Sequence, residues 1–139
     1  MRHLAPILLC CALQAGAQRY ELRRAIAPAA LSFAAGAAWG THETLMHHNA
    51  RFFEVFPRAS RRFWGPDSWQ NKYENPWYVP VQVSDGKHLT ATMHHVALFS
   101  AGVTITLGER RPAKHYLFDA GVSLAAYSLG NWLAYDLLF

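Results

Sequence analysis

Histidines and carboxylates at helical spacing are the residues of this sequence best suited to chemistry. The chain contains eight histidines. Glu43 and His47 are four residues apart, and Asp85, His88 and His95 follow one another at intervals of three and seven. Residues with this spacing share one face of a helix. Because one apolar segment ends at the first group and the next begins at the second, we expect both groups at the same end of a bundle.

Imidazoles and carboxylates together are ligands that suit zinc, iron or manganese. All five residues are therefore candidate metal ligands, and Asp85, His88 and His95 are also candidate catalytic residues. A bound metal could activate water for attack on an ester or phosphoester, and a histidine–aspartate pair without metal could act as a general base. The sequence equally allows a structural role in which these groups only hydrogen-bond to backbone or lipid.

Other familiar catalytic motifs are absent from the sequence. It has no Gly-rich phosphate loop, no GxSxG and no cysteine metal motif. The run from His42 to His48 is similar to the histidine boxes of membrane desaturases and hydroxylases. The second group, His88, His94 and His95, has the wrong spacing for such a box. We therefore do not assign the chain to those enzymes.

The composition favours a membrane surface over a nucleic acid. Hydrophobic residues make up 52% of the chain and charged residues only 16%, below the roughly 25% of ordinary soluble domains. The net charge of +4 comes from Lys and Arg at segment ends and in one long loop. This distribution suits contact with anionic lipid head groups, so the bilayer is the expected partner and no nucleic acid is expected.

The pattern of apolar segments predicts an all-α fold. Residues 1–17 read as a signal peptide or N-terminal anchor, with Arg2, a short apolar run and the small residues Ala15-Gly16-Ala17. Residues 18–139 then form one membrane domain, a small bundle of three apolar helices over about 22–56, 88–107 and 115–139. Small residues in the first segment predict close contact between helices.

Between the first two helices, residues 57–87 form an aromatic, proline-rich loop. Its four prolines exclude one regular helix. Trp and Tyr prefer the boundary between membrane and water. We therefore expect this loop to cap the bundle at the membrane interface, with the contact residues Trp64, Trp69, Tyr73, Trp77 and Tyr78.

The orientation of the chain in a membrane stays open. Arg110, Arg111 and Lys114 lie in a short turn, which predicts a cytoplasmic position for that turn. Arg19, Arg23 and Arg24 would then lie on the same side if the first helix spans. A cleaved signal peptide would instead place this new N-terminus outside the cytoplasm. The location expected is a bacterial membrane, most simply the inner membrane.

Two resemblances concern the aromatic loop and the start of the second helix. The chain resembles a family of small uncharacterised bacterial membrane proteins with an FWxPxSWxNKY segment followed by (S/T)DGxHL, over roughly residues 36–95. The matching runs are Phe63-Trp64-Gly65-Pro66, Ser68-Trp69, Asn71-Lys72-Tyr73 and Ser84-Asp85-Gly86-Lys87-His88-Leu89. Asp85-x-x-His88 is also similar to the helix start of VanZ-like proteins. Both resemblances imply membrane association and no particular reaction.

Three functions are compatible with these features. The first is an accessory or structural membrane protein with a polar histidine–carboxylate cluster at one interface, for which other membrane subunits are candidate partners. The second is a metal-dependent membrane enzyme that acts on a lipid or its head group. The third is a soluble periplasmic helical domain. The sequence favours the first function, because no complete set of catalytic residues can be identified in it.

Overall fold

The computed structural model of the chain describes residues 21–74 and 80–139. Within them, only helices and turns occur, which confirms the all-α prediction. The expected signal segment, 1–17, lies outside the described residues. The elements in chain order are α2 (Arg23–His47), α3 (Asn49–Val55), α4 (Arg61–Trp64), η1 (Ser68–Gln70), α5 (Asn71–Glu74), η2 (Val81–Val83), α6 (Gly86–Thr106), α7 (Ala113–Trp132) and η3 (Leu133–Leu138).

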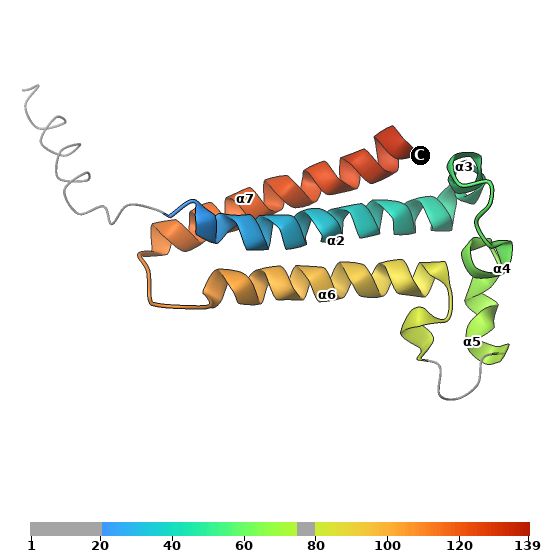
Figure 1. Cartoon of the computed structure of the whole chain (residues 1–139), viewed down its shortest axis with the longest axis horizontal. Coiled ribbons are helices and arrows are strands. Elements are labelled where there is room, and N and C mark those ends of the chain that lie inside the picture. Colours follow the sequence, from blue (N-terminus) through green and yellow to red (C-terminus); the bar gives the residue numbers. More distant parts are fainter. Residues whose placement is uncertain (1–20, 75–79) are drawn as a thin grey trace, which may run out of the picture.

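Three long helices form the body of the molecule, and α2 is the central one. Figure 1 shows α2 lying between α6 and α7, with α3, α4 and α5 folded across one end. Both outer helices pack chiefly along α2 and touch each other little. The short connection between α6 and α7 lies at the opposite end. We refer to these as the capped end and the hairpin end of the bundle.

The first helix is shorter than the sequence indicates. A continuous helix over 22–56 was expected, but α2 stops at His47 and the chain turns at His48, where φ is −135° and ψ is 40°. The side chain of Asn49 donates hydrogen bonds to the carbonyl oxygens of Leu45 and Trp64, at 3.4 and 2.8 Å. The long-range bond to Trp64 ties the turn to the cap, and such a contact leaves no trace in local periodicity.

Close packing of α2 against α7 depends on glycines. A Cβ added at Gly36 would lie 2.9 Å from the backbone nitrogen of Asn131, and one at Gly40 would lie 2.7 Å from the Asn131 carbonyl oxygen. On the facing helix, a Cβ at Gly130 would lie 3.0 Å from the backbone nitrogen of Ala37. The backbones therefore approach to a distance that only glycine allows, as the small residues in the sequence predict.

The long helices bury small and polar residues and expose large apolar ones. Buried positions along α2, α6 and α7 include Ser32, Ala35, Ala38, Thr44, Thr90, His94, Ala101 and Ser123. Exposed positions on the same helices include Ile26, Phe33, Val96, Leu98, Phe99, Val103, Leu117, Phe118, Leu124, Leu129 and Trp132. We call this exposed set the apolar belt. A helix that packs against a core in water has the opposite arrangement, with its large apolar residues buried and its polar residues exposed.

Among the described residues, a conventional apolar core lies at the capped end. It consists of Leu45, Phe52, Phe53 and Phe139, with Trp64 packed against it. Rings in this cluster lie 5.2 to 5.7 Å apart, between Phe52 and Trp64 and between Phe52 and Phe139. The aromatic cap thus has its own packing and holds the end of the chain against α3.

Hydropathy along the individual helices gives a separate finding. Across residues 21–74 and 80–139, no helix meets the combined length and hydropathy requirement for a membrane span.

A glycine substitution tests the contact between α2 and α7. Gly36→Ala is expected to lower the free energy of unfolding by about 1–3 kcal/mol, because its Cβ would overlap the backbone of α7. Gly102→Ala is the matched control on α6, since a Cβ there would have nothing within 4 Å. The control should be neutral or stabilising by about 0.5–1 kcal/mol. Thermal unfolding followed by circular dichroism measures both, and equal midpoints for the two variants would contradict the proposed contact.

Candidate functional site

The site is built on Asp85, the residue immediately before α6. Its side chain is fully buried, and Oδ1 accepts hydrogen bonds from the backbone N–H groups of Lys87 and His88, at 3.0 and 3.1 Å. The first N–H groups of a helix have no partner within the helix, so a carboxylate at this position both satisfies them and complements the helix dipole. Asp85 therefore fixes where α6 begins.

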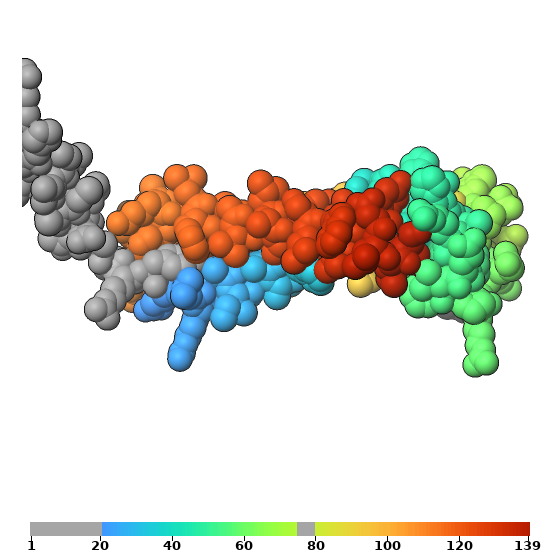
Figure 2. All heavy atoms as spheres, turned by 90° about the horizontal axis from the view of Figure 1, so that it is seen from above, coloured from blue at the N-terminus to red at the C-terminus, as the bar shows by residue number. Residues whose placement is uncertain are grey.

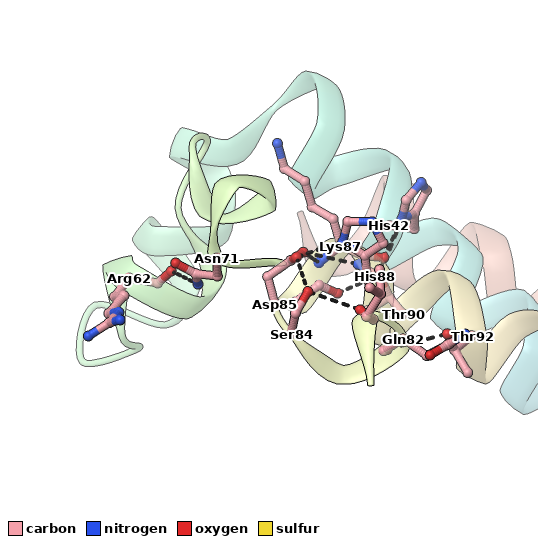
Figure 3. A network of polar contacts seen from close by, with 12 residues as sticks. His42, Arg62, Asn71, Gln82, Ser84, Asp85, Lys87, His88, Thr90 and Thr92 are labelled. Atoms are coloured by element: carbon pink, nitrogen blue, oxygen red, sulfur yellow. Dashed lines mark hydrogen bonds and ion pairs between the residues drawn. The ribbon is translucent and has the colours of Figure 1, made fainter. Parts of the chain in front are cut away.

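The second carboxylate oxygen of Asp85 orients a histidine. Oδ2 accepts a hydrogen bond from the Ser84 hydroxyl at 2.9 Å and lies 2.6 Å from Nδ1 of His88 (Figure 3). With the carboxylate as acceptor, the neutral form of His88 carries its proton on Nδ1 and has its lone pair on Nε2. The His88 side chain is 31% exposed, so this pair can present a basic nitrogen to an outside molecule.

Ser84 is not placed as a nucleophile. Its hydroxyl is directed to Asp85 and to the carbonyl oxygen of Val81, both at 2.9 Å. A nucleophilic serine needs its hydroxyl hydrogen-bonded to the base that removes its proton. The site therefore contains an oriented imidazole, that of His88, but Ser84 is not a nucleophile beside it.

The cap is attached directly over this helix start. A Cβ added at Gly86 would overlap the Trp64 ring, with Cζ3 at 2.6 Å. The ammonium of Lys87 donates to the carbonyl oxygen of Pro66 at 2.7 Å. Glycine at position 86 and lysine at position 87 thus join α6 to the loop that carries the aromatic residues.

A histidine from α2 completes the network, although it is not among the candidate ligands expected from the sequence. Nδ1 of His42 lies 3.0 Å from the Lys87 carbonyl oxygen and 3.3 Å from the Thr90 hydroxyl oxygen (Figure 3). The His42 ring stacks on Trp39, with centroids 5.1 Å apart and planes inclined by 25°. His42 therefore connects the middle helix to the first turn of α6.

His94 makes a second connection between helices. It is buried, and its Nδ1 lies 3.2 Å from the Ala35 carbonyl oxygen of α2. Its ring lies 4.8 Å from that of Trp39 and 5.8 Å from that of Tyr127 on α7, centroid to centroid. The sequence contains a signal for this contact. Gly86, Thr90 and His94 are spaced four residues apart, which places them on one face of α6, and this face packs against α2.

The five predicted metal ligands form two pairs and one separate residue. Nε2 of His47 lies 3.5 Å from Oε2 of Glu43, and His88 is paired with Asp85 as described. His95 is exposed, and its Nδ1 lies 2.7 Å from a carbonyl oxygen of its own helix. Within the described residues, no three His, Cys, Asp or Glu side chains are grouped so that they could hold a metal ion.

The predicted interface residues lie in different surroundings. Trp64 is half-buried against the aromatic core, whereas Trp69 and Tyr73 are exposed on the outside of the cap. The ammonium of Lys72 lies over both exposed rings, 5.7 and 4.9 Å from their centroids. The other two, Trp77 and Tyr78, lie outside the described residues.

At the hairpin end, a buried ion pair holds the chain. Nη1 of Arg111 donates to Oδ2 of Asp119 at 2.7 Å, and Nη2 donates to the carbonyl oxygen of Ile105 at 2.6 Å. The hydrogen bond to Asp119 raises the pKa of Arg111 above its ordinary value, against the opposing effect of burial. Sequence reasoning missed this pair, because its residues are eight apart and not on one helix.

Comparison of the chain with protein-family models, with curated proteins and with solved structures finds no match. The resemblance to small bacterial membrane proteins stays a prediction.

Substitution of Asp85 tests its double role. Asp85→Ala removes every acceptor from the helix start and from His88, so we expect a loss of about 1–3 kcal/mol in the free energy of unfolding. Asp85→Asn should lose about half as much, because asparagine caps a helix equally well but cannot accept a hydrogen bond from His88 through its amide nitrogen.

The control is Asp67→Ala. Asp67 also precedes a helix, η1, but it is exposed and makes no side-chain capping bond. Its replacement should change stability by less than about 0.5 kcal/mol. Denaturant unfolding measures all three variants, and an Asp85→Ala value as small as that of Asp67→Ala would remove Asp85 as the basis of the site.

Proposed function

We propose that this chain is a small integral membrane protein with a structural or accessory role, and that its aromatic cap rests at the membrane–water interface. The observation that carries the proposal is the reversed polarity of the bundle. Large apolar side chains face outward along all three long helices, whereas Ser, Thr, His and small residues face inward. Lipid tails are a suitable environment for such an exterior, and water is not.

The dimensions of α6 support this placement. The helix has 21 residues, which corresponds to about 31 Å at 1.5 Å per residue. The hydrocarbon layer of a bilayer is about 30 Å thick. No Asp, Glu, Lys or Arg occurs in the sequence between Lys87 and Glu109. The charged residues on either side of this helix would then lie at the two lipid head-group layers.

The polar residues inside the bundle are compatible with lipid around it. The hydroxyls of Thr44 and Thr90 donate to carbonyl oxygens four residues earlier, at 3.0 and 2.8 Å. Thr41 and Thr104 make the same bond, at 2.9 and 2.6 Å. Hydroxyls bonded within their own helix need no water. Ala, Gly, Ser and Thr lower the mean hydropathy of a helix, whichever way its large side chains point.

A structural role fits the bonding of the candidate site. Asp85 binds the helix start, His88 and Ser84, and Lys87 binds the cap. His42 and His94 bind backbone atoms of neighbouring helices. These groups hold the protein together, and the outer surface of the cap, with Trp69 and Tyr73, is left for the interface or a membrane partner.

A charge placed on the apolar belt separates a membrane protein from a water-soluble one. Phe99 and Tyr73 are equally exposed, each with 74% of its surface accessible. Phe99 lies near the middle of α6 and Tyr73 lies on the cap. In a membrane, Phe99→Lys should cost about 2.5–3.5 kcal/mol of insertion free energy, whereas Tyr73→Lys should be tolerated.

The measurement is the fraction of protein that stays in bacterial membranes through an alkaline carbonate wash. Wild type and Tyr73→Lys should be retained, and Phe99→Lys should be depleted. Release of the wild-type protein by the wash, or equal retention of the two lysine variants, would contradict the membrane placement. In a water-soluble bundle both substitutions should change stability by less than about 0.5 kcal/mol.

A further inference from the structure

An open apolar groove of about 580 Å³ lies at the capped end of the bundle. It is formed where η3 meets α3 and the turn that follows α3, two parts of the chain that adjoin in the space-filling view of Figure 2. Its aromatic and aliphatic lining includes Phe52, Phe56, Ala59, Trp64, Leu138 and Phe139. This volume falls in the range of about 300–1,000 Å³ that is usual for pockets that bind small molecules.

Of the described residues that line this apolar groove, one is a cation. Arg58 is exposed and follows Pro57 directly, at the turn after α3. Within the described residues, no hydrogen bond or ion pair engages the Arg58 guanidinium. Its neighbours differ: Arg61 lies over the Phe53 ring at 4.5 Å, and Arg62 lies 3.6 Å from a carboxylate oxygen of Glu74.

A free guanidinium beside an aromatic groove matches one kind of ligand chemistry. Arginine binds phosphate through two parallel N–H groups, and the groove accepts an apolar chain. Phe56 and Leu138 are 43% and 49% exposed. Leu138 also lines a second apolar groove together with Phe33 of the apolar belt, so an acyl chain can enter from that side.

We propose that the groove binds an anionic phospholipid, with one acyl chain against the aromatic lining and the phosphate on Arg58. The proposal rests on the membrane placement proposed above. The capped end would then hold one bound lipid molecule, in addition to the lipids of the surrounding bilayer. Basic residues next to the membrane surface attract anionic lipids.

The experiment uses full-length protein purified in mild detergent and mixed with phosphatidylglycerol and phosphatidylcholine of identical acyl chains. Native mass spectrometry counts the retained lipids. Wild type should retain about five times more phosphatidylglycerol than phosphatidylcholine, because the choline ammonium offsets the phosphate charge in the second lipid. This ratio is the one expected for one cation near the surface. Arg58→Gln should reduce this ratio to about one. Arg51→Gln, a change at an exposed arginine of α3 that does not line the groove, should leave the ratio unchanged.

A second pair of variants tests the groove itself. Ala59→Phe fills the groove and should reduce the retention of both lipids. Gly102→Phe fills a different apolar groove, of about 340 Å³ between α6 and α7, which no charged residue lines. That control should retain phosphatidylglycerol as wild type does. Equal lipid retention by wild type, Arg58→Gln and Ala59→Phe would overturn the proposal.

The same preparations separate this proposal from the membrane placement. Each variant is first taken through the carbonate wash, and its helix content is checked by circular dichroism. If Arg58→Gln is folded and retained in the membrane but binds lipid as wild type does, the proposed lipid site is wrong and the membrane placement is unaffected. Wild-type protein washed from the membrane would overturn the proposed function, whatever lipid it binds in detergent.

Discussion

The carboxylate of Asp85 is the interaction on which the cap and the candidate site both depend. A fully buried carboxylate is costly unless hydrogen-bond donors surround it, and here two backbone N–H groups, a hydroxyl and an imidazole do so. The same bonds start α6 and orient His88. Since Gly86 and Lys87 hold the aromatic loop, the position of the cap follows from the position of this helix start.

The bundle below the cap is held by close backbone contact rather than by a core of large side chains. Gly36, Gly40 and Gly130 bring α2 and α7 together, and the buried hydroxyls of Thr44 and Thr90 are bonded within their own helices. Large apolar residues are consequently left on the outside. Exposed apolar surface costs about 25 cal/mol per Å² in water and nothing in hydrocarbon. The solvent that removes this cost is lipid, which is the basis of the proposed function.

The two ends of the bundle use different chemistry. Arg111 and Asp119 form a buried ion pair at the hairpin end, whereas aromatic packing around Phe52 closes the capped end. The aromatic end has a groove lined by Arg58, whose guanidinium has no hydrogen bond or ion pair among the described residues. The ion pair at one end and the open apolar groove at the other are compatible with the membrane protein proposed above, which would contact lipid or a partner through its cap.

The sequence by itself determined the local features: an all-helical chain, a helix start close to His88, and the pairs Glu43–His47 and Asp85–His88. Each of these depends on residues three or four apart on one helix, which spacing predicts directly. Only the tertiary structure decided that the two pairs remain separate and that His42 and His94 connect the helices. Those outcomes depend on how far each helix is rotated about its axis. That rotation is set by long-range contacts, among them glycine against backbone between α2 and α7 and His94 against the Ala35 carbonyl between α6 and α2, which no local spacing contains.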